Sequence, residues 1–298
     1  MSLVLKNVSK SFAGKQAVDN ISFSLEKPGV YGLLGTNGAG KTTTFRMILG
    51  LIDDYDGKIL LNGKKIDYKV TDIIGFLTEE RSLLTKLTVD EQIKFYGALK
   101  SLDEKTIEER LDYWLERFNI KEYKSRKIKS LSKGNQQKIQ FISAIINEPK
   151  LLILDEPFSG LDPVNVELFK NIILELKKKG TIIIFSSHRM EHVELFCEKL
   201  VVLVKGKCVL SGYLKDIKDK YKKKNIIVKG DFNIDKIKEL DGVIDIKKEN
   251  DRYIISIEDD SYTNKIFKEI SKYDIKMFSE EDPSLNEIFL SVVGENYE

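Results

Sequence analysis

The sequence predicts an α/β fold with a largely parallel sheet, on three observations. Short apolar runs that are typical of buried strands alternate with segments of helical period. Two early segments, 2–8 and 17–25, instead alternate apolar and polar residues, which is typical of half-buried antiparallel strands. A Lys-rich stretch, 218–224, then precedes a set of short strands and helices. We therefore expect an α/β domain over residues 1–220 and a small C-terminal α+β domain over residues 221–298.

The predicted elements follow one another in a simple order. Thr88, with Glu91 three residues later, predicts the capped start of a helix. From about residue 84 to residue 147 the apolar residues recur at helical spacing. In the first domain we expect further helices over 41–51, 104–118, 134–147 and 164–179, and strands over 30–34, 73–77, 151–154, 181–186 and 199–204. In the second we expect strands over 225–229, 243–248 and 253–258, and helices over 234–240, 262–272 and 285–293.

The composition excludes several classes of protein. Lys and Arg total 49 against 47 Asp and Glu, so the net charge of +2 provides no basic field for nucleic acid. Two cysteines, Cys197 and Cys208, are too few for a disulfide framework and indicate reduced thiols, as in the cytosol. The apolar runs are far shorter than the roughly 20 residues that span a bilayer. Because the N-terminus also lacks the pattern of a secretory signal, we expect a cytoplasmic protein.

Residues 35–42 read GTNGAGKT and match the phosphate-binding pattern G-x-x-x-x-G-K-[ST]. The glycines let backbone N–H groups surround a polyphosphate, and the helix that follows adds partial positive charge. Lys41 is expected to reach the β- and γ-phosphates, and the Thr42 hydroxyl to bind Mg²⁺. The alternative is a glycine-rich turn before a helix, but the strand and helix predicted on either side favour phosphate binding. We expect the nucleotide to contact Gly35, Thr36, Asn37, Gly38, Ala39, Gly40, Lys41, Thr42 and Thr43.

Two carboxylates end the apolar strand predicted over 151–154. Asp155 at the strand tip suits a contact with Mg²⁺, and Glu156 suits a base that polarises a water for attack on the γ-phosphate. Strands that end in acidic turn residues are common, so this pattern alone indicates little. Its distance after a phosphate-binding loop favours a site that hydrolyses ATP with Mg²⁺.

Further motifs carry a resemblance to one family. LSKGNQQ, residues 131–137, resembles the signature sequence of the ABC ATPases and lies between the phosphate-binding loop and the acidic strand, as in that family. SGLD, residues 159–162, resembles the family's D-loop, and SSH, residues 186–188, resembles the segment that holds its switch histidine. Phe12 lies where the family places an aromatic residue that stacks on adenine. Taken singly, a histidine or a phenylalanine reads as an ordinary surface or core residue, whereas the combination is specific.

The resemblance implies a fold and a mechanism. The fold is that of a P-loop NTPase of the ABC class, with a RecA-like core sheet, an antiparallel β subdomain and a helical subdomain over about 84–147. Two such domains pair head to tail, so that Ser132 and Gly134 of one contact the γ-phosphate held by the other. Asp162 would link the two sites, and His188 would hold the γ-phosphate and the attacking water. Hydrolysis then opens the dimer.

The sequence departs from the family pattern at three positions. Glu79 stands where the family usually has Gln in the loop after the strand over 73–77, Lys133 where Gly is common, and Asn135 where Gln is common. By resemblance this loop senses the γ-phosphate through Mg²⁺ or its water, so Glu79 is expected near the metal in a catalytic role, unless it points to solvent. These variants resemble a subgroup of bacterial exporters that includes NatA-type sodium exporters and drug exporters. The C-terminal segment DPSLNEIF, 282–289, resembles that subgroup's accessory domain.

We therefore expect the ATP-binding and ATP-hydrolysing subunit of a bacterial ABC exporter. Its partners would be an integral-membrane permease and a second copy of itself or a homologous ATPase subunit, which would place it on the inner face of the cell membrane. The helical subdomain with the Glu79 loop is the expected docking surface. One alternative is a soluble ABC ATPase that transports nothing, but the single phosphate-binding loop and the lack of heptads between Lys41 and Leu131 disfavour it. The other is a P-loop kinase, which needs no signature motif.

Overall fold

The computed structural model describes residues 1–66, 72–80 and 82–295. The chain forms two compact units, Met1–Gly212 and Tyr213–Glu298, and each is described by itself.

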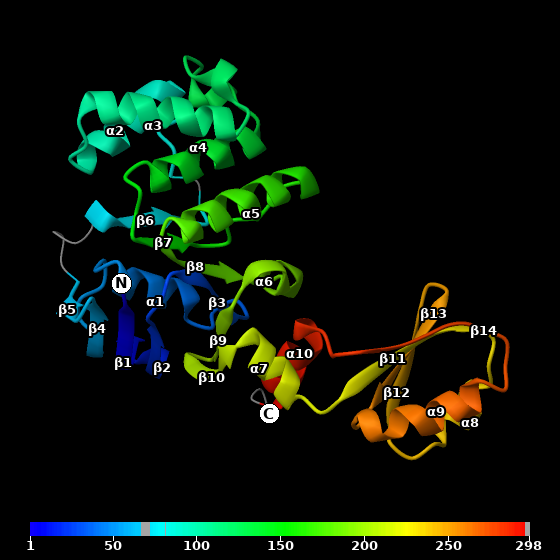
Figure 1. The fold of residues 1–298 in the computed structure, drawn as a ribbon. Helices are drawn as coiled ribbons and strands as arrows, with labels where there is room; N and C mark the ends of the chain where they lie inside the picture. Colours follow the sequence, from blue (N-terminus) through cyan, green and yellow to red (C-terminus); the bar gives the residue numbers. More distant parts are fainter. Residues whose placement is uncertain (67–71, 81, 296–298) are drawn as a thin grey trace. The chain divides into compact units, whose positions relative to one another are not determined.

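An antiparallel sheet of four strands forms one layer of the first unit (Figure 1). Its strand order is β2-β1-β4-β5, with β1 (Leu3–Phe12), β2 (Lys15–Leu25), β4 (Asp56–Leu61) and β5 (Lys64–Lys65). The prediction of two half-buried antiparallel strands is confirmed, because β1 and β2 pair from Leu3 opposite Leu25 to Phe12 opposite Lys15. Both strands run further than predicted, up to a turn at Ala13 and Gly14.

A second sheet of six strands holds the predicted parallel strands. Its order is β10-β9-β3-β8-β7-β6, with β3 (Gly29–Gly35), β6 (Ile74–Leu77), β7 (Leu151–Leu154), β8 (Ile182–Ser187), β9 (Lys199–Val204) and β10 (Lys207–Tyr213). β3 runs parallel to β8 and β9, and β7 runs parallel to β6 and β8. Every residue of β3, β7 and β8 is buried, which explains their apolar sequences. The loops that follow these strands meet at the carboxyl edge of the sheet, where α/β proteins bind their ligands.

The described part of the first unit also has six α-helices: α1 (Lys41–Ile48), α2 (Val89–Leu99), α3 (Glu104–Arg117), α4 (Lys133–Ile145), α5 (Pro163–Lys178) and α6 (Met190–Phe196). α1 buries Phe45, Met47 and Ile48 in a core that also contains side chains of both sheets. α2 and α3 lie side by side at one end of the unit, and α4 lies between them and the sheet (Figure 1). The predicted cap of α2 is confirmed: Thr88 accepts from the backbone of Glu91, whose carboxylate accepts from the backbone N of Thr88 at 2.8 Å.

The long helix α5 is capped at its start and is bonded to α3 near its end. At its start, Asp162 Oδ1 accepts a hydrogen bond from the backbone N of Asn165 at 2.9 Å. Near its end, Glu175 accepts hydrogen bonds from Tyr113 at 2.5 Å and from Arg117 at 2.8 Å, both on α3. α5 therefore connects the D-loop-like segment with the outer helices of the unit.

The second unit contains a sheet with helices inserted between its strands. Its strands are β11 (Lys224–Gly230), β12 (Val243–Glu249), β13 (Arg252–Ile257) and β14 (Ile275–Glu281), in the order β12-β13-β11-β14 with antiparallel pairs. Its helices are α7 (Leu214–Lys220), α8 (Ile234–Lys238), α9 (Thr263–Ile270) and α10 (Leu285–Glu295). Isoleucines of β11, β13, α8 and α9 form a separate core, which confirms the predicted α+β character of this region.

The sequence patterns did not reveal several short elements. β10 and β14 contain no fully buried residue, so neither has the apolar run that predicts a strand. α6 and α7 have seven residues each, which is too short to establish a helical period. The Lys-rich stretch 218–224, interpreted as a solvated helix end or linker, covers the end of α7 and the start of β11.

Candidate functional site

The loop between β3 and α1 has a backbone that only glycine accommodates at two positions. At Gly35 a Cβ atom would lie 2.5 Å from the carbonyl oxygen of Leu203, and at Gly40, where φ is +101°, it would lie 2.5 Å from that of Ala17. Separations this short are not tolerated, so these glycines let the loop pass close to neighbouring backbone. α1 begins directly after Gly40, which brings its N-terminal N–H groups to the mouth of the loop.

Lys41 lies folded back along this loop. Its Nζ donates to the carbonyl oxygens of Gly35 at 2.8 Å and Thr36 at 3.2 Å. Burial lowers the pKa of Lys41, and the nearby carboxylates of Glu156, Asp155 and Glu79 oppose that effect. The ammonium group is thus a buried cation whose attractive neighbours are backbone carbonyls and carboxylates.

A cavity of about 670 Å³ opens over the loop. Its volume lies within the range of small-molecule and cofactor sites, roughly 300–1,000 Å³. Among the described residues that line it, one cation, Lys41, faces three carboxylates. The lining residues are Ala17, Thr36, Asn37, Gly38, Ala39, Gly40, Lys41, Thr42, Thr43, Glu79, Asp155, Glu156 and His188.

Asp155, which follows β7, and Thr42 on α1 place two oxygen atoms side by side in the cavity. Thr42 Oγ1 donates to Asp155 Oδ2 at 3.1 Å, so a hydroxyl and a carboxylate from distant parts of the chain meet in the cavity. Ser186 Oγ on β8 donates to Asp155 Oδ1 at 2.5 Å and accepts from the backbone N of Glu156 at 2.9 Å. Hard oxygen donors of this kind fit Mg²⁺, which usually takes one or two protein carboxylates and completes its shell with water and phosphate oxygens.

Glu156 stands beside His188 at the same edge. Its carboxylate contacts His188 Nδ1 at 2.9 Å, and its φ of +49° is in the left-handed region, which costs a residue with a Cβ about 1–3 kcal/mol. Burial raises the pKa of Glu156, while the hydrogen bond with His188 and the charge of Lys41 lower it. A carboxylate that is partly desolvated and paired with an imidazole is suited to accept a proton from a bound water.

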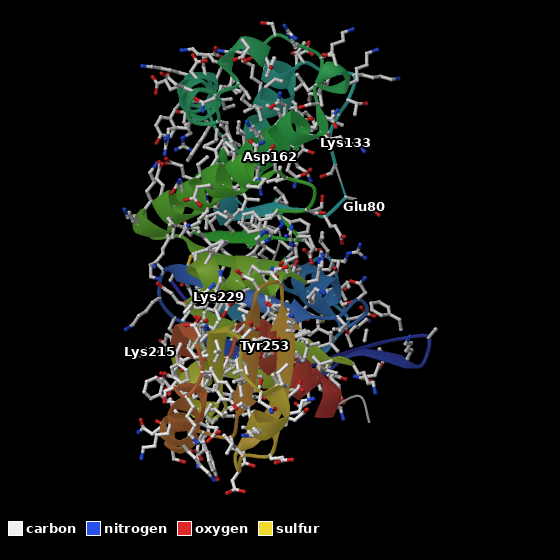
Figure 2. The ribbon with its side chains drawn as sticks, turned by 90° about the vertical axis from the view of Figure 1, so that its right-hand side faces the viewer. Glu80, Lys133, Asp162, Lys215, Lys229 and Tyr253 are labelled. Atoms are coloured by element: carbon white, nitrogen blue, oxygen red, sulfur yellow. The ribbon has the colours of Figure 1, made fainter. Side chains whose placement is uncertain are left out.

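The remaining predicted residues lie outside this cavity. Ser132 caps α4 and accepts from the backbone N of Asn135 at 3.3 Å. Asp162, which is labelled in Figure 2, caps α5. These two helix starts are neighbours, because a Cβ at Gly134 would lie 3.9 Å from Asn165 Nδ2. Phe12 ends β1, has 47% of its surface exposed and does not line the cavity. Its ring is contacted by Lys10, whose Nζ lies 5.0 Å from the ring centre. Most of the predicted residues thus form one group at the cavity and another around α4 and α5. Phe12 belongs to neither group, and Gly35 contacts Lys41 without lining the cavity.

Two contacts of the site had not been predicted. Ser186 joins the two adjacent carboxylate residues, although the sequence analysis noted it only as part of a motif. Gln140 on α4 donates to Thr78 and Glu80, the residues that flank Glu79. A polar residue on the apolar face of a predicted helix was the signal that could have indicated Gln140.

Comparison with known proteins agrees with the fold and the site. Two family models match the chain: ABC transporter over residues 18–159, and the C-terminal domain of DrrA1-3-like ATP-binding proteins over residues 212–293. The chain is 46% identical over 297 residues to the ABC transporter ATP-binding protein YhaQ of Bacillus subtilis, which covers 99% of this chain and 100% of that protein. A solved structure of an ATP-binding subunit of an ABC transporter matches with a TM-score of 0.69 at 31% identity, over 74% of this chain and 93% of that one.

Two more distant relatives have specific names. The chain is 34% identical to the ABC transporter ATP-binding protein NatA of Bacillus subtilis, over 72% of this chain and 91% of that protein. It is 32% identical to the lipopolysaccharide export system ATP-binding protein LptB of Haemophilus influenzae, over 70% of this chain and 90% of that protein.

A glycine-rich loop between strand and helix, with three carboxylates and a histidine around its cavity, is typical of a P-loop NTPase. The chain belongs to the family of ABC transporter ATP-binding proteins, which bind and hydrolyse ATP. The predicted family, including its likeness to NatA, and the predicted fold class are therefore confirmed. Within the described residues no helix has both the length and the apolar character needed to cross a bilayer.

Proposed function

We propose that this protein energises a separate membrane permease by ATP-driven pairing of two ATPase subunits, and that the transporter is an exporter. The observation that carries the proposal is the division of the motif residues into two groups. The cavity group includes Lys41, Asp155 and Glu156, whereas Ser132 and Asp162 lie at helix starts outside the cavity. A head-to-tail pair would bring the second group of one subunit to the cavity of the other. The name of LptB supports export over import.

Each residue of the cavity has a proposed part in hydrolysis. Lys41 would exchange its carbonyl contacts for the β- and γ-phosphates, and Thr42 with Asp155 would hold Mg²⁺, which supplies positive charge to the phosphates. Glu156 would take a proton from a water whose oxygen attacks the γ-phosphorus, with ADP as the leaving group. His188 would keep the Glu156 carboxylate and the water in place. Ser132 and Gly134 of the partner subunit would contact the γ-phosphate. Phe12 of the subunit that holds the nucleotide would stack on adenine.

The permease is proposed to dock on the helical segment 84–147 and the Glu79 loop, which places the protein at the inner face of the cell membrane. The test is reconstitution in liposomes with the polytopic membrane protein encoded beside it. We expect the ATPase rate to rise several-fold in the complex. A chain that binds no membrane protein and has the same rate with and without liposomes would instead support the alternative, an ABC ATPase that transports nothing.

Glu79→Gln is expected to support turnover with a less steep dependence on Mg²⁺. Three carboxylates around one cation site repel one another, so wild-type closure should require the metal more strongly than a variant with two. The measurement is ATPase rate and binding of a fluorescent ATP analogue against free Mg²⁺ at fixed nucleotide. Superimposable wild-type and Glu79→Gln curves would mean that Glu79 only faces solvent.

A chain of residues 1–220 is expected to bind ATP without the C-terminal domain. The cavity is lined only by residues of the first unit, as far as the structure describes it. We propose that residues 221–298 form an accessory domain that stabilises or regulates the subunit pair. The measurement is isothermal titration with MgATP, with circular dichroism as the control for folding. A folded truncation that fails to bind nucleotide would contradict the proposed division.

A further inference from the structure

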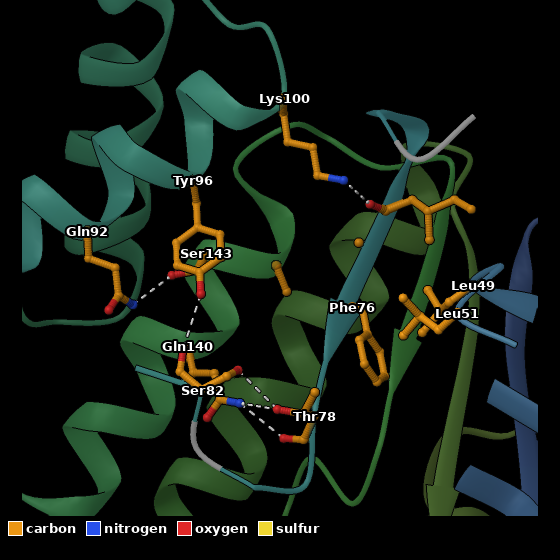
Figure 3. Close-up of a pocket in the computed structure, with 13 residues that line it drawn as sticks. Leu49, Leu51, Phe76, Thr78, Ser82, Gln92, Tyr96, Lys100, Gln140 and Ser143 are labelled. Carbon is orange, nitrogen blue, oxygen red and sulfur yellow. Dashed lines mark hydrogen bonds between the residues drawn. The ribbon is translucent and has the colours of Figure 1, made fainter. Parts of the chain in front are cut away.

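A mostly apolar pocket of about 290 Å³ is lined in part by Thr78 and Ser82, close in sequence to Glu79, which lines the ATP cavity (Figure 3). β6, α2 and α4 contribute most of its lining. The Glu79 loop, of which the structure describes residues 78–80 and 82–84, follows β6 in the chain and precedes α2. This pocket therefore borders the connection between the ATP cavity and the helices.

Gln140 reaches from α4 across this pocket to the Glu79 loop (Figure 3). Its Nε2 donates to the carbonyl oxygen of Thr78 at 3.0 Å, to Thr78 Oγ1 at 3.1 Å and to the carbonyl oxygen of Glu80 at 3.2 Å. Both residues that flank Glu79 are thus held by one amide group. Glu79 itself lines the ATP cavity together with Asp155 and Glu156.

Other contacts fasten the rest of this loop to the helices as well. Tyr96 on α2 donates to the carbonyl oxygen of Ser82 at 3.1 Å, and the backbone N of Leu84 donates to Gln92 Oε1 at 2.8 Å. Just before the loop, Leu77 at the end of β6 is held in the sheet, where its carbonyl oxygen accepts from the backbone N of Asp155 at 2.8 Å. The described part of the loop is thus tied by side-chain hydrogen bonds to both α2 and α4.

The carbonyl oxygen of the Gln140 side chain accepts no hydrogen bond from the described residues. Gln140 is only 4% exposed, and its Oε1 is buried without a hydrogen-bond partner in the part of the chain that the structure describes. Leaving a buried acceptor unpaired is unfavourable, and a leucine would fill the same space without that cost. The buried Oε1 of Gln140 lowers stability, whereas its Nε2 makes three hydrogen bonds. These hydrogen bonds, and not packing, therefore explain why a glutamine stands at this position.

We propose that Gln140 is a positioning residue for the ATP site, which sets the place of Glu79 by holding Thr78 and Glu80 to α4. Because α4 begins at the signature sequence, the position of Glu79 in the cavity follows the position of the signature helix within the same subunit. The proposal rests on the proposed role of Glu79 in the site.

The test compares three variants of the full chain. Gln140→Leu removes the donor, Gln140→Glu keeps the size but places an oxygen against the two carbonyls, and Ser143→Ala is the matched control. Ser143 lines the same pocket from the same helix and contacts Gln92, not Thr78 or Glu80. We expect kcat to fall about tenfold in Gln140→Leu and further in Gln140→Glu, with KM for ATP within about twofold, because a misplaced group lowers the rate more than binding.

A readout that does not depend on activity accompanies the kinetics. Amide hydrogen exchange of the peptide that contains Thr78 and Glu80 should be faster in Gln140→Leu than in wild type. The melting temperature of the Gln140→Leu protein should equal or exceed that of wild type. Ser143→Ala should leave both the exchange of that peptide and kcat as in wild type. A melting temperature that falls in parallel with kcat, with unchanged exchange at the loop, would show a merely structural role and overturn the proposal.

A double-mutant cycle separates this proposal from the role of Glu79. If Gln140 acts through Glu79, Gln140→Leu should have little further effect on kcat in a Glu79→Ala background, so the two losses should not add. Fully additive losses would overturn the proposal. If Glu79→Ala alone leaves kcat unchanged, the proposed role of Glu79 fails, and with it the positioning role, even where loop exchange shows that Gln140 holds the loop.

Discussion

Replacing Glu156 with Gln is expected to stop ATP hydrolysis while leaving ATP binding intact. The amide has the shape of the carboxylate but cannot accept the proton of the attacking water, so kcat should fall by about 10²–10⁴-fold. The contacts that would hold the nucleotide come from the glycine-rich loop and Lys41, and these do not involve the Glu156 side chain. Phosphate release measured beside binding of a fluorescent ATP analogue tests the separation of the two properties.

The same variant should accumulate an ATP-dependent pair of subunits. Because ATP would be held between two copies and no longer cleaved, the pair should persist through size-exclusion chromatography with MgATP and be absent without it. Glu167→Gln, on the exposed face of α5, is the control, and it should hydrolyse ATP and elute as wild type does. A Glu156→Gln protein that stays monomeric at saturating ATP would contradict the head-to-tail arrangement.

Glu156→Gln should also change how stability depends on pH. Burial raises the pKa of Glu156 in the folded protein, so the folded state holds the proton more tightly than the unfolded chain does. That contribution is present below the unfolded pKa and is lost as pH rises through the folded pKa. Wild type should therefore lose stability relative to the Gln variant as pH rises from the ordinary pKa of a glutamate carboxyl through the raised pKa of Glu156. Melting curves over this range test the sign, and a Gln variant that becomes relatively less stable with rising pH would contradict it.

Lys41→Met is expected to raise the Kd for ATP by at least about tenfold. Among the described residues that line the cavity, the Lys41 ammonium group is the cation that faces three carboxylates. Its removal would leave a negatively charged site for an anionic ligand. Hydrogen bonds to charged groups contribute about 1.5–3 kcal/mol, which corresponds to roughly a 10- to 150-fold rise in Kd. The repulsion from the carboxylates adds to this loss.

Isothermal titration with MgATP measures the effect of Lys41→Met, and Lys170→Met provides the control. Lys170 lies on α5, pairs with Glu167 at 3.2 Å and is absent from the cavity lining, so its loss should leave Kd unchanged. Circular dichroism establishes that both variants are folded. A folded Lys41→Met protein with wild-type affinity would mean that the loop backbone alone binds the nucleotide.

The parts of the fold that the sequence predicted are those with one dominant signal. The strands β7 and β9 have the predicted bounds, because each is a continuous apolar run with polar residues at or beyond its ends, which mark where the strand begins and stops. The cap of α2 follows from two side chains three residues apart. The cluster of Lys41, Asp155 and Glu156 in one cavity follows from a rule of α/β sheets, since the loops after parallel strands share an edge.

The rest required knowledge of contacts between distant residues. Nothing in the sequence near Gln140 shows that its amide reaches a loop about sixty residues earlier, because that contact depends on how α4 packs beside β6. The left-handed φ of Glu156 is not suggested by its residue type either, since local preference disfavours it. It is accompanied by a hydrogen bond from the Glu156 backbone to Ser186 on the neighbouring strand, which no local pattern could indicate.

The cap at the start of α5 and its hydrogen bonds to α3 near the end make this helix a stiff link between the D-loop-like segment and α3. It is 16 residues long, which is about 24 Å at a rise of 1.5 Å per residue. A continuous ladder of backbone hydrogen bonds makes a helix stiff along its axis. If the D-loop-like segment moved, α5 would move with it as a unit, and the contacts of Glu175 with Tyr113 and Arg117 would pass that movement to α3. The position of the outer helices would then depend on the state of the D-loop-like segment.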